Sequence, residues 1–453
     1  MRSETLDTTV ADDPSAGEEG PPRVRTGLLW VHPELRWCEL PLGVARWRLG
    51  RSPDCEISVQ DESASREHAA IQRKGPVLVL NDLGSTNGTF VNGTRVEQGL
   101  LKAGSILRIG ECVAVVCVTV EVDIGARFGE ISPTLYAGPA LRRVLEPLSQ
   151  FASSDLPILL EGATGTGKER VAEYVHVQSR RAGPFHAINC AALPPAVAEN
   201  ELFGHARGAF TGADSTHSGH FLAAHRGTLF LDEIAELSLP IQAKLLRVVQ
   251  EQKVTRLGDT RSIPIDVRIV AACQGSLGTL VDAQRFRADL RARLAGARFE
   301  LPSLRGRPEE APFYFRRFLQ LHSGGRPPAI EGRVMERICL HDWPGNLREL
   351  ELLARELLVL HGHEPSIRRA HLPEHLRSSG SALDAAEPPQ KADLRKLAGA
   401  LHAWGGNLTR ASSALGMSRA RAYRLLEGLR VDQLMAQFPA PERSGTRAPG
   451  SES

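Results

Sequence analysis

The sequence has few aromatic residues and no long apolar run. Phe, Trp and Tyr make up 5% of the 453 residues, whereas apolar residues as a whole make up 42%. The longest continuous apolar run, from Val113 to Val120, includes Thr119, and it is much shorter than the roughly 20 residues that a membrane-spanning helix needs. The composition therefore predicts a globular protein without a membrane span.

Paired cysteines and a strong net charge are absent as well. The seven cysteines are an odd number without C-x-x-C spacing, so we expect reduced thiols rather than disulfides or a zinc site. The first twenty residues hold one base and six acids, which is typical of neither a signal peptide nor a transit peptide and favours a cytoplasmic protein. The net charge is 55 − 53 = +2, so any attraction for nucleic acid must be local.

The length allows about three domains, and composition changes along the chain divide it further. The acidic start is poor in apolar side chains and is expected to be disordered. Short β-branched runs then predict an all-β domain, and strand-like runs that alternate with helical periodicity predict an α/β domain with a parallel sheet. The expected segments are a tail, the all-β domain, a linker, the α/β domain, a linker, a helical domain and a disordered tail, at residues 1–24, 25–122, 123–135, 136–375, 376–390, 391–432 and 433–453.

Two Asn-Gly pairs mark turns in the all-β segment. They are Asn87-Gly88 and Asn92-Gly93, and both follow a strand-like run at 77–80. Because both central residues of a type I′ turn need a positive φ, each pair predicts a two-residue hairpin.

A glycine-rich motif of the form G-x4-G-K lies between a strand-like run at 158–160 and a helical pattern that begins at Glu169. Glycines allow backbone N–H groups to turn toward phosphate oxygens, the following helix N-terminus adds partial positive charge, and the lysine meets the outer phosphates. The motif predicts a cradle for a nucleoside triphosphate, and Glu169 stands where the general motif has a hydroxyl for magnesium. The cradle residues are Gly162, Ala163, Thr164, Gly165, Thr166, Gly167 and Lys168.

Two carboxylates end a second strand-like run, at residues 228–231. Asp232 is suited to hold Mg²⁺ through a water molecule, and Glu233 to polarise the water that attacks the γ-phosphate. An Asp-Glu pair alone is also typical of a solvated strand end. Following a phosphate loop, the pair predicts ATP hydrolysis.

Between these two motifs lies the string GAFTGA, preceded by ELFGH at residues 201–205. An exposed Phe-Thr pair between glycines is costly unless it contacts something, which indicates a contact loop. Through these strings, residues 136 to about 375 resemble the AAA+ ATPase domain of the bacterial enhancer-binding proteins, which activate sigma-54 RNA polymerase. The resemblance implies that the loop engages sigma-54 and drives the closed promoter complex open. The implied contacts are Gly208, Ala209, Phe210, Thr211, Gly212 and Ala213.

Other residues match this family in the same order. The resemblance implies that Asn189 couples the catalytic glutamate to the nucleotide state, and that Arg348, in WPGNLREL at 343–350, is the sensor II arginine of a helical lid. Arg287 and Arg293 resemble the arginine fingers that reach the ATP of the neighbouring subunit, where a planar guanidinium suits the charge on the transferred phosphoryl group. A ring oligomer follows, which by family is a hexamer.

The chain departs from the family at one catalytic position. Where the family normally has Thr-Asn, Cys273-Gln274 follows the strand-like run at 267–271. Gln274 keeps an amide that can help to place the attacking water, while Cys273 replaces a hydroxyl by a weaker donor. Slow hydrolysis is therefore an open alternative. Glu169 is no such departure, because it is the usual residue in this family.

Three loop-like stretches of the all-β segment carry groups suited to a phosphate dianion, namely two guanidinium groups, a hydroxyl and an amide. Their strings GR, SRxH and NG resemble a forkhead-associated (FHA) domain, a β-sandwich that reads phosphothreonine peptides. The resemblance implies a phosphothreonine protein or a Ser/Thr kinase as partner, with Gly50 and His68 as scaffold. The implied phosphate contacts are Arg51, Ser65, Arg66, Thr86 and Asn87.

The segment from Lys391 to Arg430 carries eight bases and two acids, and its net charge of 8 − 2 = +6 favours DNA. Thr409 and Ser418 are expected to cap two helices joined by a short glycine turn, which predicts a helix-turn-helix. Residues 407–426 resemble the Fis-type reader at the end of enhancer-binding proteins. The implied contacts to double-stranded DNA at enhancer sites are Arg419, Arg421 and Arg424.

These patterns predict a multidomain activator of sigma-54 RNA polymerase, with an all-β FHA sandwich, an α/β AAA+ P-loop ATPase with a helical lid, and an all-α helix-turn-helix. ATP and Mg²⁺ are the expected cofactors, and Ser/Thr phosphorylation is the expected signal. Two alternatives stay open. One is another AAA+ remodeller, such as a helicase loader, which has no need of the GAFTGA string. The other is a DNA-bound FHA scaffold whose ATPase is weak or decayed.

Overall fold

The computed structural model of the protein describes residues 24–120, 123–211, 213–378 and Leu401. The chain divides into two units, residues 1–379 and 380–453, and the elements given below belong to the first. The helix-turn-helix expected at 391–432 lies, Leu401 apart, outside the described residues. So do the residues expected to contact DNA, which are Arg419, Arg421 and Arg424.

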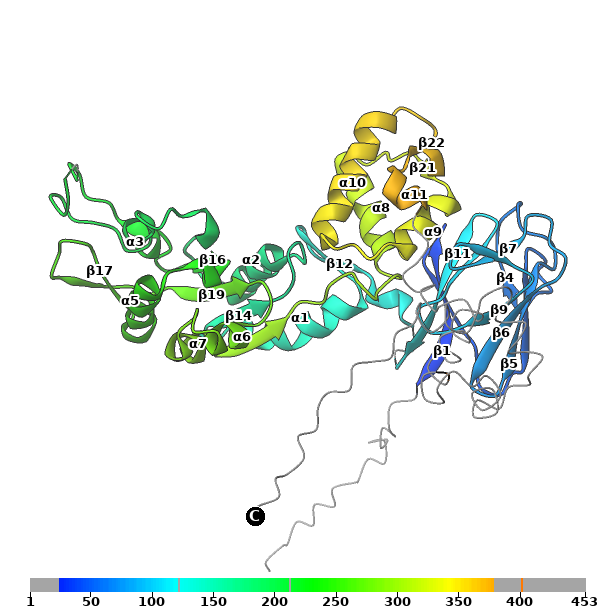
Figure 1. The fold of residues 1–453 in the computed structure, drawn as a ribbon, viewed down its shortest axis with the longest axis horizontal. Helices are drawn as coiled ribbons and strands as arrows, with labels where there is room; N and C mark the ends of the chain where they lie inside the picture. The colour runs from blue at the N-terminus through cyan, green and yellow to red at the C-terminus, as the bar shows by residue number, and fades with distance from the viewer. Residues whose placement is uncertain (1–23, 121–122, 212, 379–400, 402–453) are drawn as a thin grey trace, which may run out of the picture. The chain divides into compact units, whose positions relative to one another are not determined.

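The first part of the chain forms a sandwich of two sheets, as expected (Figure 1). One sheet has the strand order β2-β1-β11-β10-β7-β8 and the other β4-β3-β5-β6-β9. Side chains such as Leu28, Ile71 and Val116 fill the space between them. The strands are β1 (Arg25–His32), β2 (Arg36–Glu39), β3 (Arg46–Gly50), β4 (Ile57–Ser58), β5 (Ala69–Lys74), β6 (Val77–Asp82), β7 (Thr89–Val91), β8 (Thr94–Val96), β9 (Gln98–Leu101), β10 (Ile106–Ile109) and β11 (Cys112–Thr119).

The two Asn-Gly pairs have different roles. Asn92 and Gly93 have φ of 49° and 82° and join the paired strands β7 and β8, so the predicted hairpin is confirmed there. The same prediction is wrong for Asn87-Gly88, because β6 and β7 on either side of it lie in different sheets. This Asn-Gly pair lies in the connection that crosses from one sheet to the other. The side chain of Asn87 donates to the carbonyl of Ser63 in a neighbouring loop.

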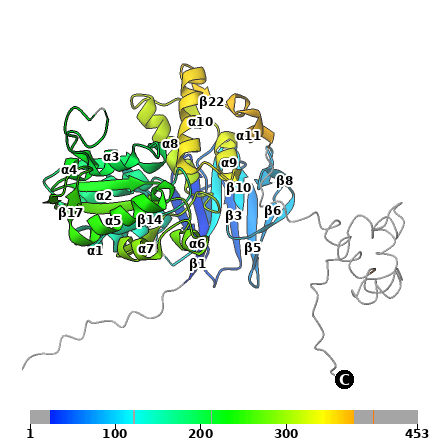
Figure 2. The same ribbon diagram turned by 60° about the vertical axis from the view of Figure 1, so that its left-hand side comes forward.

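The expected α/β domain is built on a parallel sheet with the order β15-β16-β19-β14-β20. Figure 2 shows helices packed around it. Its elements are α1 (Pro139–Ala152), β14 (Ile158–Glu161), α2 (Lys168–Ser179), β15 (Phe185–Asn189), η2 (Cys190–Ala192), α3 (Ala198–Phe203), α4 (Gly219–Ala223), β16 (Thr228–Asp232), η3 (Ile234–Glu236), α5 (Leu239–Glu251), β17 (Lys253–Thr255), β18 (Ser262–Pro264), β19 (Arg268–Cys273), α6 (Leu277–Asp282), α7 (Ala288–Leu294) and β20 (Ala297–Glu300).

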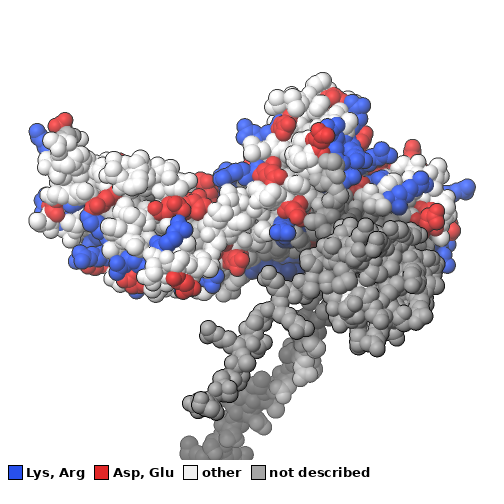
Figure 3. Space-filling model, viewed as in Figure 1, with Lys and Arg blue, Asp and Glu red and all other residues white. Residues whose placement is uncertain are grey.

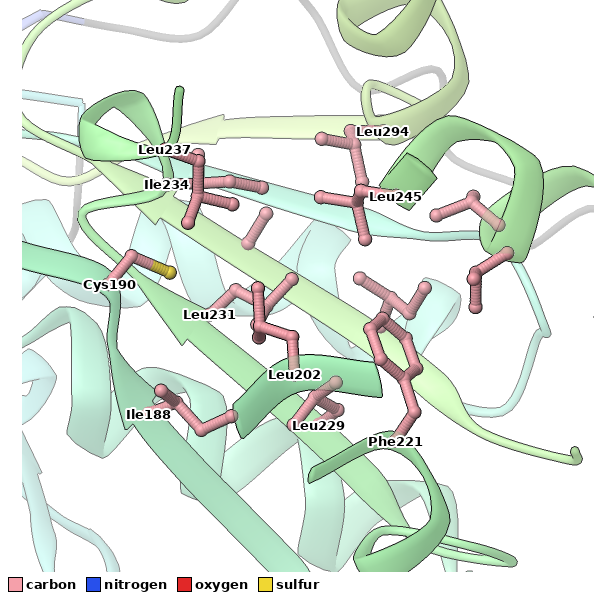
Figure 4. Close-up of a cluster of buried hydrophobic side chains, with 14 of the residues drawn as sticks. Ile188, Cys190, Leu202, Phe221, Leu229, Leu231, Ile234, Leu237, Leu245 and Leu294 are labelled. Atoms are coloured by element: carbon pink, nitrogen blue, oxygen red, sulfur yellow. The ribbon is translucent and has the colours of Figure 1, made fainter. Parts of the chain in front are cut away.

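Each face of this sheet has its own apolar core. Helices α3, α4, α5 and α7 cover one face, and Figure 4 shows their side chains packed on Leu229 and Leu231 of β16. Between these two residues, Phe230 belongs to the cluster on the opposite face, with α1 and α2. Because side chains alternate along a strand, a sheet covered on both faces needs continuous apolar strands, as β14, β16 and β19 have.

The sheet order brings three predicted motifs to one edge. The phosphate loop follows β14, the pair Asp232-Glu233 closes β16, and Cys273-Gln274 closes β19. These strands are neighbours in the order β16-β19-β14. The carboxyl ends of parallel strands meet at one edge of the sheet, where ligands of such folds bind. The parallel topology therefore assembles the nucleotide site.

A helical lid follows the sheet. Its core holds Trp343, whose indole N–H donates to the Ile338 carbonyl at 2.9 Å. The elements of the lid are α8 (Ala311–His322), β21 (Ala329–Ile330), α9 (Gly332–Leu340), α10 (Asn346–His361), β22 (Ser366–Ile367), η4 (Arg369–His371) and α11 (Glu374–Ser378). The segment expected as a linker, residues 123–135, contains η1 (Gly125–Arg127) and β12 (Gly129–Ser132), which pairs with β13 (Leu135–Ala137).

The sandwich and the lid share one apolar core. Leu28 of β1 and Ala114 of β11 face the inside of the sandwich, whereas Leu29 and Val115 belong to a cluster with the lid helices α8 and α9. Figures 1 and 2 both show α9 beside this sheet. Burial on both faces explains the apolar residues 113–117 of the run that the sequence analysis used only to exclude a membrane span, whereas Val118 and Val120 at its end are exposed.

No helix within the described ranges is long and apolar enough to cross a membrane. On the face drawn in Figure 3, Lys and Arg side chains are intermixed with Asp and Glu side chains over the described residues. This face therefore carries no large patch of one sign of charge on its described residues.

The shared core predicts that the lid loses stability when its packing on the sandwich is weakened. Met335 of α9 is fully buried in this cluster. We expect Met335→Ala to lower the free energy of unfolding by about 2–5 kcal/mol, because it leaves a cavity. The control is Val359→Ala on α10, where the side chain is 82% exposed and the expected change stays within about 0.5 kcal/mol. Urea unfolding followed by circular dichroism measures both variants, and equal midpoints would contradict the prediction.

Candidate functional site

The phosphate loop turns between β14 and α2. Gly165 and Gly167 have φ of 77° and 93°, values that favour glycine. Lys168 is buried, and its Nζ donates to the Gly162 carbonyl at 3.0 Å and lies 3.9 Å from the carboxylate of Glu233. The N-terminus of α2 and this ammonium group together give the loop the positive potential that a triphosphate needs.

The acidic pair lies beside the loop, at the end of β16. Asp232 accepts the backbone N–H of Glu233 at 3.0 Å, and Glu233 has a left-handed φ of 49°. Such φ values at non-glycine residues cluster at functional sites. The Glu233 carboxylate approaches Lys168 and also accepts the backbone N–H of Gln274 at 3.2 Å. The Glu233 carboxylate is therefore held between the start of α2 and the end of β19.

The departure from the family at Cys273-Gln274 leaves this backbone contact intact. Gln274 reaches Glu233 through its main-chain N–H, which does not depend on the side chain. Burial raises the pKa of the Cys273 thiol to about 12, so the thiol stays protonated at neutral pH. The thiol donates to the Gly275 carbonyl at 3.3 Å. The strand end thus keeps its hold on the acidic pair despite the unusual side chains.

Asn189 lies close to the acidic pair but does not bond to Glu233 among the described residues. It ends β15 in register with Asp232 and lines the same cavity as the phosphate loop. Its side chain accepts the N–H of Ala191 at 2.9 Å and so caps η2. The coupling to Glu233 that the resemblance implies therefore remains a prediction.

The first turn of α10 docks directly on the phosphate loop. The N–H of Leu347 donates to the Gly165 carbonyl at 3.0 Å, and the side-chain amide of Asn346 donates to the Thr164 carbonyl at 2.9 Å. A Cβ at Gly165 would lie 2.2 Å from the carbonyl oxygen of Gly345. The sequence analysis missed these contacts, although both residues stand in the WPGNLREL string beside the arginine it selected.

The phosphate loop, the acidic pair and the lid enclose a cavity of about 450 Å³. It offers backbone N–H donors, a buried ammonium group and two carboxylates beside an apolar wall that includes Leu135 and Phe318. This donor set fits ATP, with a magnesium ion at Asp232. Arg317 and Glu351 also line the cavity and were not predicted. The predicted residues that line it are Thr164, Gly165, Thr166, Gly167, Lys168, Glu169, Asn189, Asp232, Glu233 and Arg348.

The GAFTGA loop is closed at its base and exposed at its tip. The N–H of Gly208 donates to the carbonyl of Ala213 at 2.9 Å, and Ala213 is buried. Phe210 is 48% exposed, and Thr211 is exposed beside it. Gly212 lies outside the described residues. The loop thus presents an aromatic ring and a hydroxyl on a narrow base.

The predicted phosphate-reading residues of the sandwich meet at adjoining loops. The backbone N–H of Arg51 donates to the Ser65 carbonyl at 3.0 Å, and the backbone N–H of Thr86 donates to the Ser65 hydroxyl at 3.2 Å. The Asn87 amide donates to the same loop as Ser65, and the side chains of Arg51 and Arg66 are exposed. Two guanidinium groups are therefore accessible beside a hydroxyl and an amide.

Gly50 and His68 hold these loops from within. A Cβ at Gly50 would lie 2.2 Å from the Arg66 carbonyl oxygen, so no side chain fits there. His68 is fully buried. Its Nδ1 accepts the N–H of Ser65 at 3.1 Å, and its Nε2, which then carries the proton, points to the Gly88 carbonyl at 3.3 Å. Burial lowers the pKa of His68, in keeping with this neutral ring.

Asp82, which the sequence analysis missed, organises the third loop. It accepts the hydroxyls of Ser85 and Thr89, both at 2.5 Å, and the backbone N–H of Gly84 at 2.9 Å. Burial disfavours its charged form, but these hydrogen bonds outweigh burial and lower the pKa of Asp82. The available signal was that Ser85 follows Asp82 by three positions, since aspartate side chains commonly bond to nearby residues in turns.

Models of known protein families match three parts of the chain. Residues 135–300 match the Sigma-54 interaction domain, residues 47–110 the FHA domain and residues 305–388 the AAA+ ATPase lid domain. The transcriptional regulatory protein ZraR of Salmonella typhi is 40% identical over 302 residues, which cover 65% of this chain and 67% of ZraR. The chain belongs to the family of sigma-54-dependent transcriptional regulators.

Two other regulators are also similar to part of the chain. ZraR of Escherichia coli (strain K12) is 40% identical over 289 residues, or 62% of this chain and 65% of ZraR. The DNA-binding transcriptional activator HyfR of that organism is 44% identical over 238 residues, or 51% of this chain and 36% of HyfR. The chain thus spans less than two thirds of either protein.

A solved structure supports the assignment of the nucleotide site. NtrX from Brucella abortus, also solved in complex with ADP, is 31% identical with a TM-score of 0.50, over 65% of this chain and 69% of NtrX. With the domain matches, this similarity shows that the regulator carries an AAA+ ATPase domain with its lid.

The two predicted arginine fingers lie outside the cavity of their own chain. Arg287 precedes α7 and Arg293 lies on it, and both are exposed. Arg287 pairs with Asp289 at 2.8 Å. A residue that acts on the nucleotide of a neighbouring protomer must be exposed in the single chain. Both arginines meet this requirement, and their role remains a prediction.

The close approach of the lid at Gly165 gives a direct test of the site. We expect Gly165→Ala to weaken ADP binding by about tenfold or more, or about 1.4 kcal/mol, because the added Cβ would push the lid off the phosphate loop. The matched control is Gly306→Ala. Gly306 has nearly the same φ, 76° against 77°, but open space around its Cβ position. Titration with a fluorescent ADP analogue measures both, and equal affinities would refute the role of this contact.

Proposed function

We propose that this regulator hydrolyses ATP to remodel sigma-54 RNA polymerase from the closed into the open promoter complex. The observation that carries the proposal is the exposed pair Phe210-Thr211 on a closed base, in the same domain as a nucleotide cavity with its phosphate loop, acidic pair and lid. Nucleotide-dependent movement of this domain would then act on polymerase through the loop.

Each residue of the cavity has a role in the proposed hydrolysis. Lys168 and the N–H groups at the start of α2 bind the phosphates. A Mg²⁺ ion, held through water by Asp232, would neutralise charge on the phosphate oxygens. Glu233, fixed by the backbone of Gln274, polarises the attacking water. Arg348 approaches from the lid and would sense whether the γ-phosphate is present.

Hydrolysis is proposed to need a ring of protomers, a hexamer by family. Arg287 and Arg293 would enter the site of the next protomer, where a guanidinium group stabilises the charge on the transferred phosphoryl group. Their exposure in the single chain supports this role.

The proposed partners of the other domains follow from charge and loop chemistry. The segment 391–430, with a net charge of +6 in the sequence, is proposed to bind enhancer DNA through Arg419, Arg421 and Arg424. The FHA loops are proposed to bind a phosphothreonine protein or a Ser/Thr kinase. Binding of this partner is the signal that is proposed to regulate the protein. A protein with these partners works in the cytoplasm.

The alternative of a scaffold with a decayed ATPase rests on Cys273, which replaces the usual hydroxyl residue of this position. The retained contact between Gln274 and Glu233 speaks against full decay. An ATPase assay of the full-length chain beside Lys168→Ala separates the two functions. Hydrolysis no faster than that of the variant would establish the scaffold.

The tip of the GAFTGA loop should separate hydrolysis from polymerase remodelling. We expect Thr211→Ala to abolish promoter melting by sigma-54 polymerase in vitro while ATP hydrolysis stays within about twofold, since the exposed hydroxyl takes no part in the nucleotide cavity. Permanganate footprinting of the promoter and a phosphate-release assay measure the two activities. Lys168→Ala should abolish both, and undiminished melting by Thr211→Ala would sink the proposal.

The FHA loops should bind a phosphate dianion through Arg51. We expect Arg51→Ala to weaken binding of a phosphothreonine peptide pool by about tenfold or more, because a charge-assisted hydrogen bond contributes about 1.5–3 kcal/mol. Basal ATP hydrolysis should not change. The control is Arg46→Ala, an exposed arginine at the other end of β3, which should bind as wild type. Fluorescence anisotropy measures the affinity, and equal binding by both variants would contradict this assignment.

A further inference from the structure

The FHA sheet holds lid helix α9 with a buried ion pair. Arg108 of β10 donates through Nε to Glu336 of α9 at 2.9 Å, and the two side chains are 7% and 5% exposed. The guanidinium also stacks on the Phe90 ring at 3.8 Å and donates to the Gly110 carbonyl. A buried carboxylate that loses its cation is left uncompensated, which makes such a pair a strong restraint on the position of the helix.

The N-terminus of α9 is fixed by a second FHA residue. The carboxylate of Glu111, in the turn between β10 and β11, accepts the backbone N–H of Gly332. A carboxylate at this place satisfies a free N–H of the first turn and complements the helix dipole. The two backbones also lie close together, because a Cβ at Gly332 would be 2.2 Å from the Glu111 carbonyl oxygen. Glu111 thus approaches the start of α9 with both its side chain and its backbone, and this leaves the N-terminus of α9 little room to move.

The same Glu111 is bonded to the phosphate-reading loops. Its backbone N–H donates to Asp61 at 2.6 Å, and Asp61 also accepts the N–H and the hydroxyl of Ser63 at 2.9 and 2.7 Å. The carbonyl of Ser63 accepts the side-chain amide of Asn87, a predicted phosphate contact. Burial works against the charge on Asp61, but these hydrogen bonds prevail and lower its pKa. A charged group thus links the loop of Asn87 to the turn that holds α9.

At its other end, α9 leads directly to the phosphate loop of the ATPase. The Trp343 indole bonds back to the Ile338 carbonyl of α9 at 2.9 Å. The backbone N–H of Asn346 donates to the Trp343 carbonyl at 2.8 Å, and the Asn346 side chain reaches the Thr164 carbonyl. Hydrogen bonds therefore connect α9 to the first turn of α10, which carries Asn346 and Arg348.

We propose that Glu111 and Arg108 of the FHA domain are positioning residues of the ATPase site, and that phosphothreonine binding changes nucleotide affinity through Asp61, Glu111 and α9. This inference rests on the proposed recognition of phosphothreonine and names how that recognition regulates the ATPase within one chain. A bound phosphate would draw the Asn87 amide away from the Ser63 carbonyl. The hydrogen bonds of Ser63 to Asp61 would then change, and with them the contact of Glu111 with α9. The affinity of each ligand must then change by the same factor when the other binds.

The geometry makes Glu111 the residue to change. Glu111→Ala removes the carboxylate that holds Gly332 but keeps the backbone N–H that bonds to Asp61, so the phosphate-reading loops are left intact. Glu111→Gln keeps an oxygen that can accept the Gly332 N–H and serves as the conservative rescue. Glu97→Ala, an exposed glutamate of the same domain, is the matched control.

The experiment measures the affinity of the full-length chain for a fluorescent ADP analogue, with and without a saturating phosphothreonine peptide pool. In the wild type, Glu97→Ala and Glu111→Gln, we expect the pool to change the dissociation constant of the analogue by about fivefold or more, the usual lower range of such coupling. In Glu111→Ala the peptide pool should bind as in wild type. The pool should then change the dissociation constant of the ADP analogue by less than about twofold. The unphosphorylated pool should have no effect in any variant.

Each outcome decides a different claim. If the phosphorylated pool binds no better than the unphosphorylated one, the proposed phosphothreonine recognition fails. If the pool binds but the affinity for the analogue does not change, or if Glu111→Ala retains the full change, this further inference is overturned and recognition stands.

A measurement without peptide tests the positioning role separately. We expect Glu336→Gln to raise the KM for ATP about threefold or more while kcat changes by less than about twofold. A less firmly held α9 weakens the contact of the lid with the phosphate loop, but it leaves the catalytic carboxylate of Glu233 in place. An unchanged KM in a folded variant would contradict this role. If Glu336→Gln does not fold, the KM of Glu111→Ala against Glu111→Gln gives the same comparison.

Discussion

A backbone contact between the lid and the phosphate loop organises the nucleotide site. The N–H of Leu347 and the side chain of Asn346 bond to carbonyls of the loop, and the absence of a Cβ at Gly165 permits this approach. The position of the lid relative to the phosphate loop therefore depends on this contact. Arg348 lies in the first turn of α10, which makes this contact, and it therefore lines the cavity.

The FHA domain is part of the same assembly, because its sheet supplies one wall of the lid core. Strands β1, β10 and β11 are buried on both faces, and the burial of Met335 and Val115 in one cluster joins the FHA domain to the lid of the ATPase. A buried ion pair and a capped helix N-terminus fix the orientation of this packing. Apolar area provides most of the stability of such an interface, and the polar contacts select one arrangement.

Much of the fold and of the site could be predicted from the sequence, because their signals are local. The phosphate loop, the acidic pair at Asp232 and the GAFTGA loop are contiguous strings, and each depends on the backbone around it. The failure at Asn87-Gly88 has the opposite cause. The turn residues were identified correctly, but the partner strand is chosen by packing over the whole sandwich. The contacts of Asn346, Asp82 and Glu111 join residues far apart in the chain or depend on a turn that forms around them.

Short strings in the sequence predicted which loops suit phosphate, which carboxylates suit magnesium and water, and which loop suits contact with a partner. These properties follow from residue type and short spacing. Which surfaces of the chain pack together is visible only in the folded structure. The apolar run at 113–120 was compatible with any buried strand, and only packing showed that its outer face covers α9. Contacts between distant segments depend on the sum of many small packing energies, which no short string contains.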